Sequence, residues 1–453
     1  MRLPAPHSKP DAAFGAFRGA HHRHQRGLAA LTVVMAIFFV LALVAAYTNR
    51  NVVFEQRMAA GSQRAERAIA VADGAVDWAL AMLNGGRIDS NCQPSTDVND
   101  SDFRSRYLGL VATSGAYSVI GFPDTLAYPG CKVSGTALNC VCPKSGDGDV
   151  AIDAGTDNDA SFRVSFLLPG SSFQTPAGTV LLQVRGCSNA GSGGSTCYGT
   201  TKNPGVDAKS DVRANVGLLK ALAAPPQSTL TAGGSLSAPG VTVRAANRDN
   251  PTGLVLHVGS AITIDVGTSV LQGPPGSSGA NTKLEGDAVL AKLKTDDRFF
   301  ESLFGMERAL FKRLPGALSI PCAAGCKLSD LDARNWLTTY AGKVVYVDGD
   351  LTIDESGAVP ATIGSNSRPA MLVVNGKLTI AAPIELIGFF YGNSIDWTGT
   401  AAGASVRGAL ISANDVTADA TMTLTYDSAL LEAIRLGYGS YVRVPGGWNR
   451  GGI

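Results

Sequence analysis

One long uncharged segment constrains this chain more than any other feature. Between Gly27 and Asn49 there is no Asp, Glu, Lys or Arg. About twenty apolar residues are enough to cross a bilayer as a helix. Beyond Asn49 a charged, Ala-rich helical pattern continues without Gly or Pro to Ala60. The segment therefore predicts a single N-terminal membrane anchor that carries the rest of the chain.

The charge of residues 1–27 predicts the orientation of this anchor. This basic leader contains one acid, Asp11, and five basic residues: Arg2, Lys9, Arg18, Arg23 and Arg26. Basic flanks of a membrane-spanning helix stay in the cytoplasm. The residues beyond Tyr47 are therefore expected outside the cytoplasm.

The cysteines agree with an oxidising compartment. All eight lie beyond the predicted anchor: Cys92, Cys131, Cys140, Cys142, Cys187, Cys197, Cys322 and Cys326. We expect disulfides, whose pairing the sequence leaves open among about 105 possibilities. A zinc site is a weaker interpretation, because the spacings are unusual for zinc ligands and His257 is the only histidine beyond the leader. No metal or cofactor is expected.

Composition narrows the class of protein. The net charge is +1 and no basic stripe is present, so nucleic acid is not an expected partner. Hydrophobic residues make up 45% of the chain and there are 53 glycines. This composition favours folded β-structure with many turns over disorder.

A helical stripe follows the anchor. Its apolar residues recur at steps of three, four or seven: Met58, Ala65, Ile69, Ala72, Val76, Leu80 and Leu83. Asn84-Gly85-Gly86 is a stop signal, because Gly readily adopts the conformation that ends helices. We predict one helix over residues 28–86, anchor and amphipathic part together, roughly 85 Å long at ~1.5 Å per residue.

This N-terminal region resembles that of PilX-type minor pilins of type IV pili. The resemblance covers residues 25–86. It is carried by the Gly-then-apolar junction, by Glu55-Gln56-Arg57-Met58-Ala59, and by the Ala-rich run from Arg67 to Ala75 with Asp73 near its end. It implies that prepilin peptidase cleaves after Gly27, which leaves Leu28 as the mature N-terminus. It also implies assembly with other pilins through the helix.

One position departs from the pattern of major pilins. They carry Glu at the fifth mature position, where this chain has Thr32. That Glu neutralises the N-terminal amine of a neighbouring subunit inside a bundle of low dielectric constant, where a lone charge is costly. Thr32 favours a tip or initiating subunit over a repeating one. Two alternatives for the N-terminus remain open: a secretory signal peptide cleaved after Ala46, and an uncleaved signal anchor.

Residues 88–222 are expected to form a pilin-like α/β head that contains disulfides. Strand character is present at 117–120, 161–168 and 179–185. The acidic segment 145–159 lacks the ligand order of an EF-hand, so a solvated loop is expected there rather than a calcium site. Ala223-Ala224-Pro225-Pro226 predicts a domain boundary.

Residues 227–453 are expected to form a β-rich repeat domain. Val344–Ile353 and Leu372–Ile380 share an apolar strand, a Gly turn and Leu-Thr-Ile, and Val255–Ile264 is a weaker copy. Such copies predict a β-solenoid, with a β-sandwich of hairpins as the alternative. A helical insert near 283–313 is expected to cap one end. This region is similar to the C-terminal part of some large PilX-like proteins.

The sequence offers little for catalysis. Asp348, Asp350, Asp354 and Glu355 are close together, but turn chemistry explains acids at a Gly corner. His257 lies in a strand pattern, and no phosphate-binding loop or nucleophile elbow is present. Trp336, Trp397, Trp448 and Tyr441 are expected in the core or at its rim. We expect no enzyme and no catalytic residue.

The fold class expected is therefore α+β: a long transmembrane helix, a pilin-like head and a β-rich domain. The function expected is that of a minor pilin in pilus assembly or priming, with tip adhesion to a host or surface ligand as a further role. It would span the inner membrane once, with its head in the periplasm, before it reaches the pilus. The alternatives are a tip pseudopilin of type II secretion and a membrane-anchored, carbohydrate-active β-helix enzyme.

Overall fold

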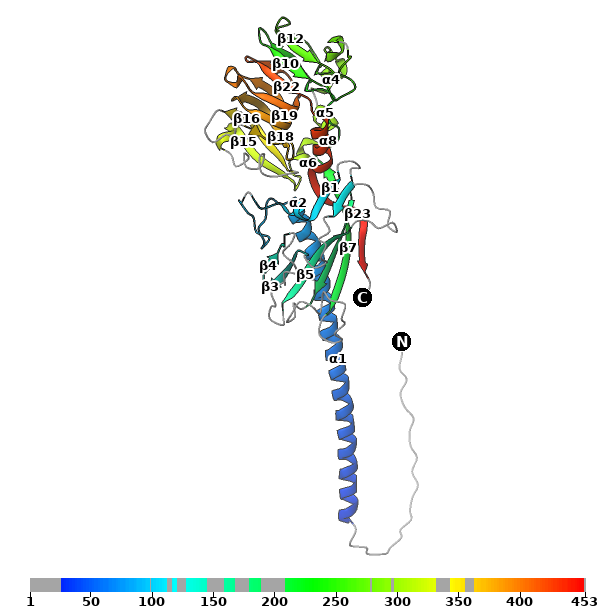
Figure 1. Cartoon of the computed structure of the whole chain (residues 1–453). Coiled ribbons are helices and arrows are strands. Elements are labelled where there is room, and N and C mark those ends of the chain that lie inside the picture. The colour runs from blue at the N-terminus through cyan, green and yellow to red at the C-terminus, as the bar shows by residue number, and fades with distance from the viewer. Residues whose placement is uncertain are drawn as a thin grey trace, which may run out of the picture. The chain divides into compact units, whose positions relative to one another are not determined.

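The computed structural model divides the chain into two compact units, residues 1–63 and residues 64–453. It describes residues 26–97, 99–111, 116–119, 128–144, 159–167, 179–188, 208–277, 279–294, 297–330, 343–354 and 362–451. The fold is mixed α and β, with a long apolar N-terminal helix and a β-rich remainder (Figure 1).

The helix predicted over residues 28–86 is present as α1 (Arg26–Asn84), which is 59 residues long. It ends where Gly85 N donates to Met82 O over 3.0 Å. The buried face of its C-terminal part consists mainly of alanine: Ala68, Ala72, Ala75, Val76, Ala79 and Leu83. Of the predicted stripe, Met58 is instead 60% exposed. Small side chains define this face because they let the helix approach a sheet closely.

That sheet belongs to the head. Its strand order is β23-β7-β6-β5-β3-β4, and every pairing is antiparallel. The strands are β3 (Gly130–Ser134), β4 (Ala137–Val141), β5 (Ala160–Leu167), β6 (Thr179–Cys187), β7 (Lys209–Lys220) and β23 (Gly439–Gly451). In β6 the residues alternate between buried and half-buried, which places Val180, Leu182 and Val184 in one core with α1. The predicted strands at 161–168 and 179–185 are confirmed.

Smaller elements complete the head. The short helix α2 (Phe103–Tyr107) begins after Asp102, whose side chain accepts a hydrogen bond from Ser105 N. It leads into a separate antiparallel pair, β1 (Leu108–Val111) and β2 (Ala116–Val119). Phe103 lies at the centre of an aromatic group with Trp78, Tyr107 and Phe166.

The β-rich part forms one parallel sheet of fifteen described strands. They are β8 (Leu230–Ala232), β9 (Leu236–Ala238), β10 (Val243–Ala246), β11 (Leu256–Val258), β12 (Ile262–Ile264), β13 (Val270–Gln272), β14 (Lys283–Leu284), β15 (Ala317–Lys327), β16 (Val344–Asp354), β17 (Thr362–Ile363), β18 (Ala370–Ala381), β19 (Glu385–Trp397), β20 (Ser405–Ser412), β21 (Val416–Ala418) and β22 (Met422–Thr425). All of these pairings are parallel, which excludes hairpins as the unit of this sheet in the residues described.

The predicted sequence copies lie next to each other in register. Leu351, Thr352 and Ile353 of β16 face Leu378, Thr379 and Ile380 of β18. The Leu and Ile side chains point into a shared core, while the Thr side chains point away from it. The weaker copy, Val255–Ile264, contributes β11 and β12 to the same sheet. A β-solenoid is not confirmed: the described strands form one curved, half-barrel sheet.

The order of the strands along the sheet differs from their order along the chain. The first strands, β8 and β9, pair with β20 and β21, which are among the last. From β8 the chain adds β11 and then β14 in one direction. The later strands lie on the other side of β8. There β15 pairs with β16, β16 with β18, β18 with β19, and β19 with β20, which is the neighbour of β8. The first and last strands of the β-rich part therefore meet inside the sheet.

The helical insert covers a face of this sheet rather than an end. It comprises α4 (Ala288–Leu293), α5 (Arg298–Phe304) and α6 (Arg308–Phe311). Phe300, Phe304 and Phe311 share a buried cluster with Tyr346 and Tyr391 of the strands. The helix α8 (Ser428–Gly437) joins the same cluster. The predicted end cap is wrong, because the phenylalanines pack against apolar side chains on the outer face of the strands.

The chain does not divide at residue 227 as the sequence suggested. The last strand, β23, was assigned to the β-rich domain over 227–453, but it pairs with β7 of the head from Gly439↔Lys220 to Gly451↔Asp211. In Figure 1 the red β23 lies beside the green β7. Residues 221–438 are therefore an insertion between two neighbouring strands of the head sheet. The turn signals mark where this insertion begins, but its end has no comparable signal in the sequence.

Gly186 of β6 is predicted to be essential for packing of α1. A Cβ atom there would lie 2.4 Å from Ala68 O and 2.8 Å from Ala72 N. Gly186→Ala should therefore lower the free energy of unfolding by about 1–3 kcal/mol, the usual cost of overpacking. Urea unfolding of the full chain in detergent micelles measures this cost.

Gly74→Ala is the matched control. A Cβ atom at Gly74 meets nothing within 4 Å, and Ala replaces Gly in a helix with a gain of ~1 kcal/mol. A neutral or stabilising result for Gly186→Ala would show that α1 is not in close contact with β6.

Candidate functional site

The apolar part of α1 is the first candidate site. Its large side chains are exposed within the isolated chain, from Leu31 at 60% through Phe38 at 74% to Phe54 at 63%. In the described residues, α1 is the one helix that is long and apolar enough to cross a membrane. A surface of this kind is stable only in lipid or among other apolar helices.

The predicted processing and assembly residues lie at the start of this helix. Gly27 and Leu28 are among its first residues, next to Arg26, and Thr32 lies one turn further on. The basic leader up to residue 25 lies outside the described residues. Between Leu28 and Phe54 the only charged residue is Arg50. No carboxylate of this chain is therefore available in that stretch to neutralise a neighbouring N-terminal amine.

Thr48 shows how a polar residue is accommodated in the exposed helix. Its hydroxyl donates to Val44 O over 2.9 Å and to Ala45 O over 3.1 Å. Such bonds within one helix satisfy a hydroxyl without a partner from outside. Thr48 therefore does not prevent α1 from lying in an apolar environment.

Disulfides fix the loops that follow α1. The structure pairs Cys92 with Cys142 and Cys131 with Cys140 in the head, and Cys322 with Cys326 at the bulge of β15. Cys187 is also disulfide-bonded, whereas Cys197 lies outside the described residues. None of the described cysteines is a free thiol. Such bridges are typical of exported proteins.

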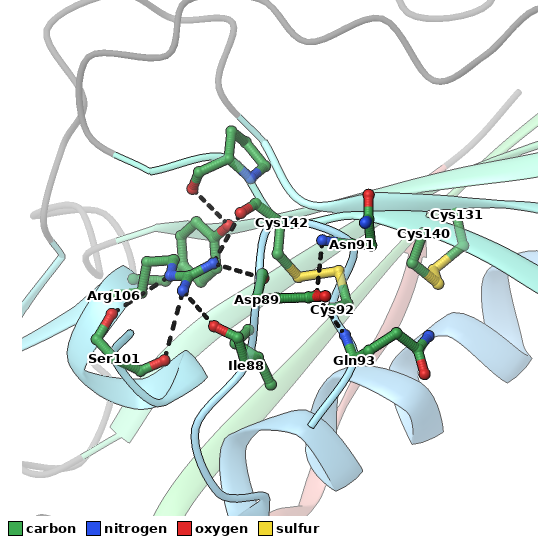
Figure 2. The surroundings of a disulfide bond; sticks show 12 residues. Ile88, Asp89, Asn91, Cys92, Gln93, Ser101, Arg106, Cys131, Cys140 and Cys142 are labelled. Atoms are coloured by element: carbon green, nitrogen blue, oxygen red, sulfur yellow. Dashed lines mark hydrogen bonds between the residues drawn. A yellow bond between two sulfur atoms is a disulfide. The ribbon is translucent and has the colours of Figure 1, made fainter. Parts of the chain in front are cut away.

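The buried side chain of Arg106 joins the loop after α1 to the Cys92–Cys142 bridge (Figure 2). Arg106 Nη2 donates to Ile88 O over 2.6 Å, and its Nη1 donates to Asp89 O over 3.0 Å and to Cys142 O over 2.8 Å. Asp89 Oδ1 in turn accepts from the backbone N–H groups of Asn91 and Gln93, each over 2.8 Å. Backbone carbonyl groups thus accept most of the hydrogen bonds of the guanidinium, which holds the loop in place.

A second polar cluster lies where α1 ends, and no pattern in the sequence predicted it. Asn84 exchanges hydrogen bonds with Tyr441: its Nδ2 donates to Tyr441 O over 2.9 Å and its Oδ1 accepts from Tyr441 N over 2.8 Å. Arg104 donates to Leu83 O, Gly437 O and Gly439 O. Two of these residues are separated by 357 positions, so no local pattern could predict the contact.

Lys343 completes the cluster at the end of α1. Its Nζ donates to Asn84 O. Burial, with a smaller contribution from the nearby Arg104 guanidinium, lowers the pKa of Lys343 to about 7. Cations near the C-terminus of a helix interact favourably with its last carbonyls. The cluster therefore caps α1 with groups from α2, from the insertion and from β23.

The acids considered for catalysis lie at corners of the sheet. Asp348 Oδ1 accepts from Asn375 Nδ2 over 2.8 Å, a bond that lowers the pKa of this carboxyl, and its Oδ2 accepts from Lys312. Asp350 accepts from Lys377 N, and Asp354 accepts from Ser329. Each acid is thus engaged in joining neighbouring strands or the helical insert. Glu355 and the acidic segment 145–158 lie outside the described residues.

The other residues considered for chemistry are likewise in structural positions. His257 bonds Asp287 over 2.8 Å, and Asp287 caps the start of α4. Trp397 is buried in the core of the parallel sheet, and Tyr441 is buried in the core of the head. Trp448 lies beside the Arg443 guanidinium. Trp336 lies outside the described residues. Within the described part of the chain, no cluster of three or more His, Cys, Asp or Glu has the arrangement of a metal site.

Comparison with known proteins leaves the family open. No protein-family model matches the chain and no curated protein matches it. Among solved structures, it is similar to the competence-associated pilin ComZ from Thermus thermophilus. That similarity has 12% sequence identity and a TM-score of 0.20, and it covers 85% of this chain and 97% of the other. A TM-score of 0.20 does not show a common fold, so the proposed function rests on this chain's own residues.

The two described bridges that differ most in loop length should differ in their effect on stability. Cys92 and Cys142 are 50 residues apart, whereas Cys322 and Cys326 are 4 apart. Chain-entropy arguments give a loss of about 4 kcal/mol for replacing the first pair with alanine and about 2 kcal/mol for the second. Urea unfolding of the two double variants measures the difference, and equal losses would contradict the assignment.

Proposed function

We propose that this chain is a pilin-like subunit that assembles through α1 into a type IV pilus or a related filament. One observation carries the proposal: a single continuous helix changes from an exposed apolar surface to a small-residue face buried on an antiparallel sheet. The first surface suits lipid and, after assembly, a bundle of similar helices. The second surface fixes a folded head to the helix. The resemblance of residues 25–86 to PilX-type minor pilins supports the same role.

Within such a filament we propose a minor subunit at the tip or at the start of assembly. A helix bundle has a low dielectric constant, in which an N-terminal amine needs a nearby carboxylate. Thr32 does not provide one, and neither does any residue from Leu28 to Phe54. A subunit with no neighbour above it needs none. A repeating subunit would leave one unpaired amine for each copy.

The inserted domain then serves for display rather than for catalysis. Its acids at 348, 350 and 354 make bonds between strands or to neighbouring segments. Adhesion to a host or other surface is part of this proposal, as are insertion in the inner membrane and maturation by prepilin peptidase. A tip pseudopilin of type II secretion would use the same helix. Loss of pili, as opposed to loss of protein secretion, in a deletion strain distinguishes the two systems.

Maturation provides the first test. Gly27→Leu should block cleavage, so that the exported chain keeps its leader, whereas the wild-type chain should begin at Leu28. Ala46→Leu is the matched control, because it would block a secretory signal peptidase instead. N-terminal sequencing and intact mass of the membrane-bound protein measure both. A wild-type chain that begins at Tyr47, or a Gly27→Leu variant that is cleaved normally, would refute the pilin assignment.

Position 32 provides a second test. Thr32→Glu supplies the carboxylate that a repeating subunit needs, so the number of copies in sheared filaments should rise several-fold relative to the other pilins. Thr32→Gln has the same length without the charge and should leave the number unchanged. Quantitative mass spectrometry of purified filaments counts the copies. No difference between the Glu and Gln variants would show that the missing carboxylate does not set the position of the subunit.

A further inference from the structure

The insertion of residues 221–438 between two strands of the head has a physical consequence. Strands β7 and β23 are antiparallel neighbours, yet about 220 residues separate their paired ends, Lys220 and Gly439. Without β23, β7 would be the edge of the head sheet. The head can therefore be completed only by a strand that follows the whole insertion in the chain.

The folded insertion holds its own two ends together. Ala221 N donates to Tyr438 O over 2.9 Å. Both residues lie in the buried cluster formed by the helices and the outer face of the parallel sheet. Tyr426 adds a second connection, since its hydroxyl donates to Pro226 O over 2.8 Å. The insertion thus delivers the chain to the start of β23 at the point where β7 ends.

The residues just after this point contact several parts of the head at once. Gly439 O accepts from Arg104 Nη2 over 3.0 Å, and Tyr441 pairs with Asn84 at the end of α1. Ser440 Oγ accepts from Gly316 N over 2.7 Å, which ties the segment to the insertion as well. Gly439 has a φ of 141°, and a Cβ atom there would lie 2.1 Å from Leu219 O. Only glycine fits this close approach of the two strands.

We propose that folding of the insertion is a checkpoint for completion of the head. When residues 221–438 are folded, β23 is held beside β7 and the end of α1 is capped. When they are unfolded, β7 and β23 are joined by a flexible loop of about 220 residues. Loop-closure entropy then weakens their pairing by about three orders of magnitude. An unfolded insertion therefore leaves β7 exposed as an edge and Asn84 without Tyr441.

The checkpoint has a role that rests on the proposed function. An exposed strand edge invites pairing with other chains, and the head is the part that α1 would carry into a filament. Subunits whose display domain has not folded would thus present an exposed β7 edge that pairs with other chains, and only subunits with a folded insertion would bring a complete head to assembly. The coupling itself is a property of the single chain and can be measured without filaments.

Hydrogen exchange in the full chain, held in detergent micelles, tests the coupling with a matched pair of variants. Val374→Asp places a charge in the core of the insertion, where Val374 is fully buried, whereas Val266→Asp changes a residue that is 85% exposed. Val374→Asp should speed exchange at least 100-fold at the β7 amides that face β23 and at the last turn of α1. Val266→Asp should leave both segments as in the wild type.

A different pattern of exchange in the Val374→Asp variant would overturn the proposal. If Val374→Asp removes protection from β16 and β18 while β7 keeps its wild-type protection, the head is complete without the folded insertion and the proposal is wrong. Exchange of the wild-type chain across a urea series covers the case in which the variant does not fold at all. There β7 must lose protection at or below the urea concentration that opens β18. Protection of β7 beyond that concentration would also overturn the coupling, and neither result depends on whether the chain forms pili.

Discussion

The close contact between the alanine face of α1 and the head sheet is the interaction on which the rest of the structure depends. Ala68 and Ala72 lie against Gly186 with no space for another methyl group, and Val76 and Leu83 share a core with the strands that flank it. This contact holds the C-terminal part of a very long helix in a folded head. The N-terminal part remains an apolar rod whose backbone hydrogen bonds are satisfied within the helix. The same helix can therefore serve a folded domain and an apolar environment.

The end of α1 is the second point at which distant parts of the chain meet. Arg104 and Lys343 donate to Leu83 O and Asn84 O, two of the carbonyl groups that a helix leaves unpaired at its C-terminus. Tyr441 exchanges two backbone hydrogen bonds with the Asn84 side chain. Buried polar groups of this kind are costly unless they are hydrogen-bonded. The head and the insertion accordingly belong to one compact unit, residues 64–453.

The insertion shows how repeats and long-range topology combine. Copies of one strand motif stack in parallel, so that Leu351 and Leu378 occupy equivalent positions in one core. The aromatic side chains of α5 and α6 cover the outer face, and Arg308 reaches Asn375 and Asn393 at the sheet corners. Burial on both faces is a general property of parallel sheets. It explains why Tyr346 and Phe389 are large aromatic residues although they point away from the core that holds Leu351 and Leu378.

The sequence by itself determined the local features. The uncharged run, the charged helix, its end at Asn84, several head strands and the register of the strand copies follow from periodicity and turn residues, which act over a few positions. Only the tertiary structure decided that β23 returns to the head, that the helical insert covers a face, and that Asn84 meets Tyr441. These contacts join residues far apart in the chain. Each is set by the complementary shape of surfaces that exist only after folding, so no short pattern encodes them.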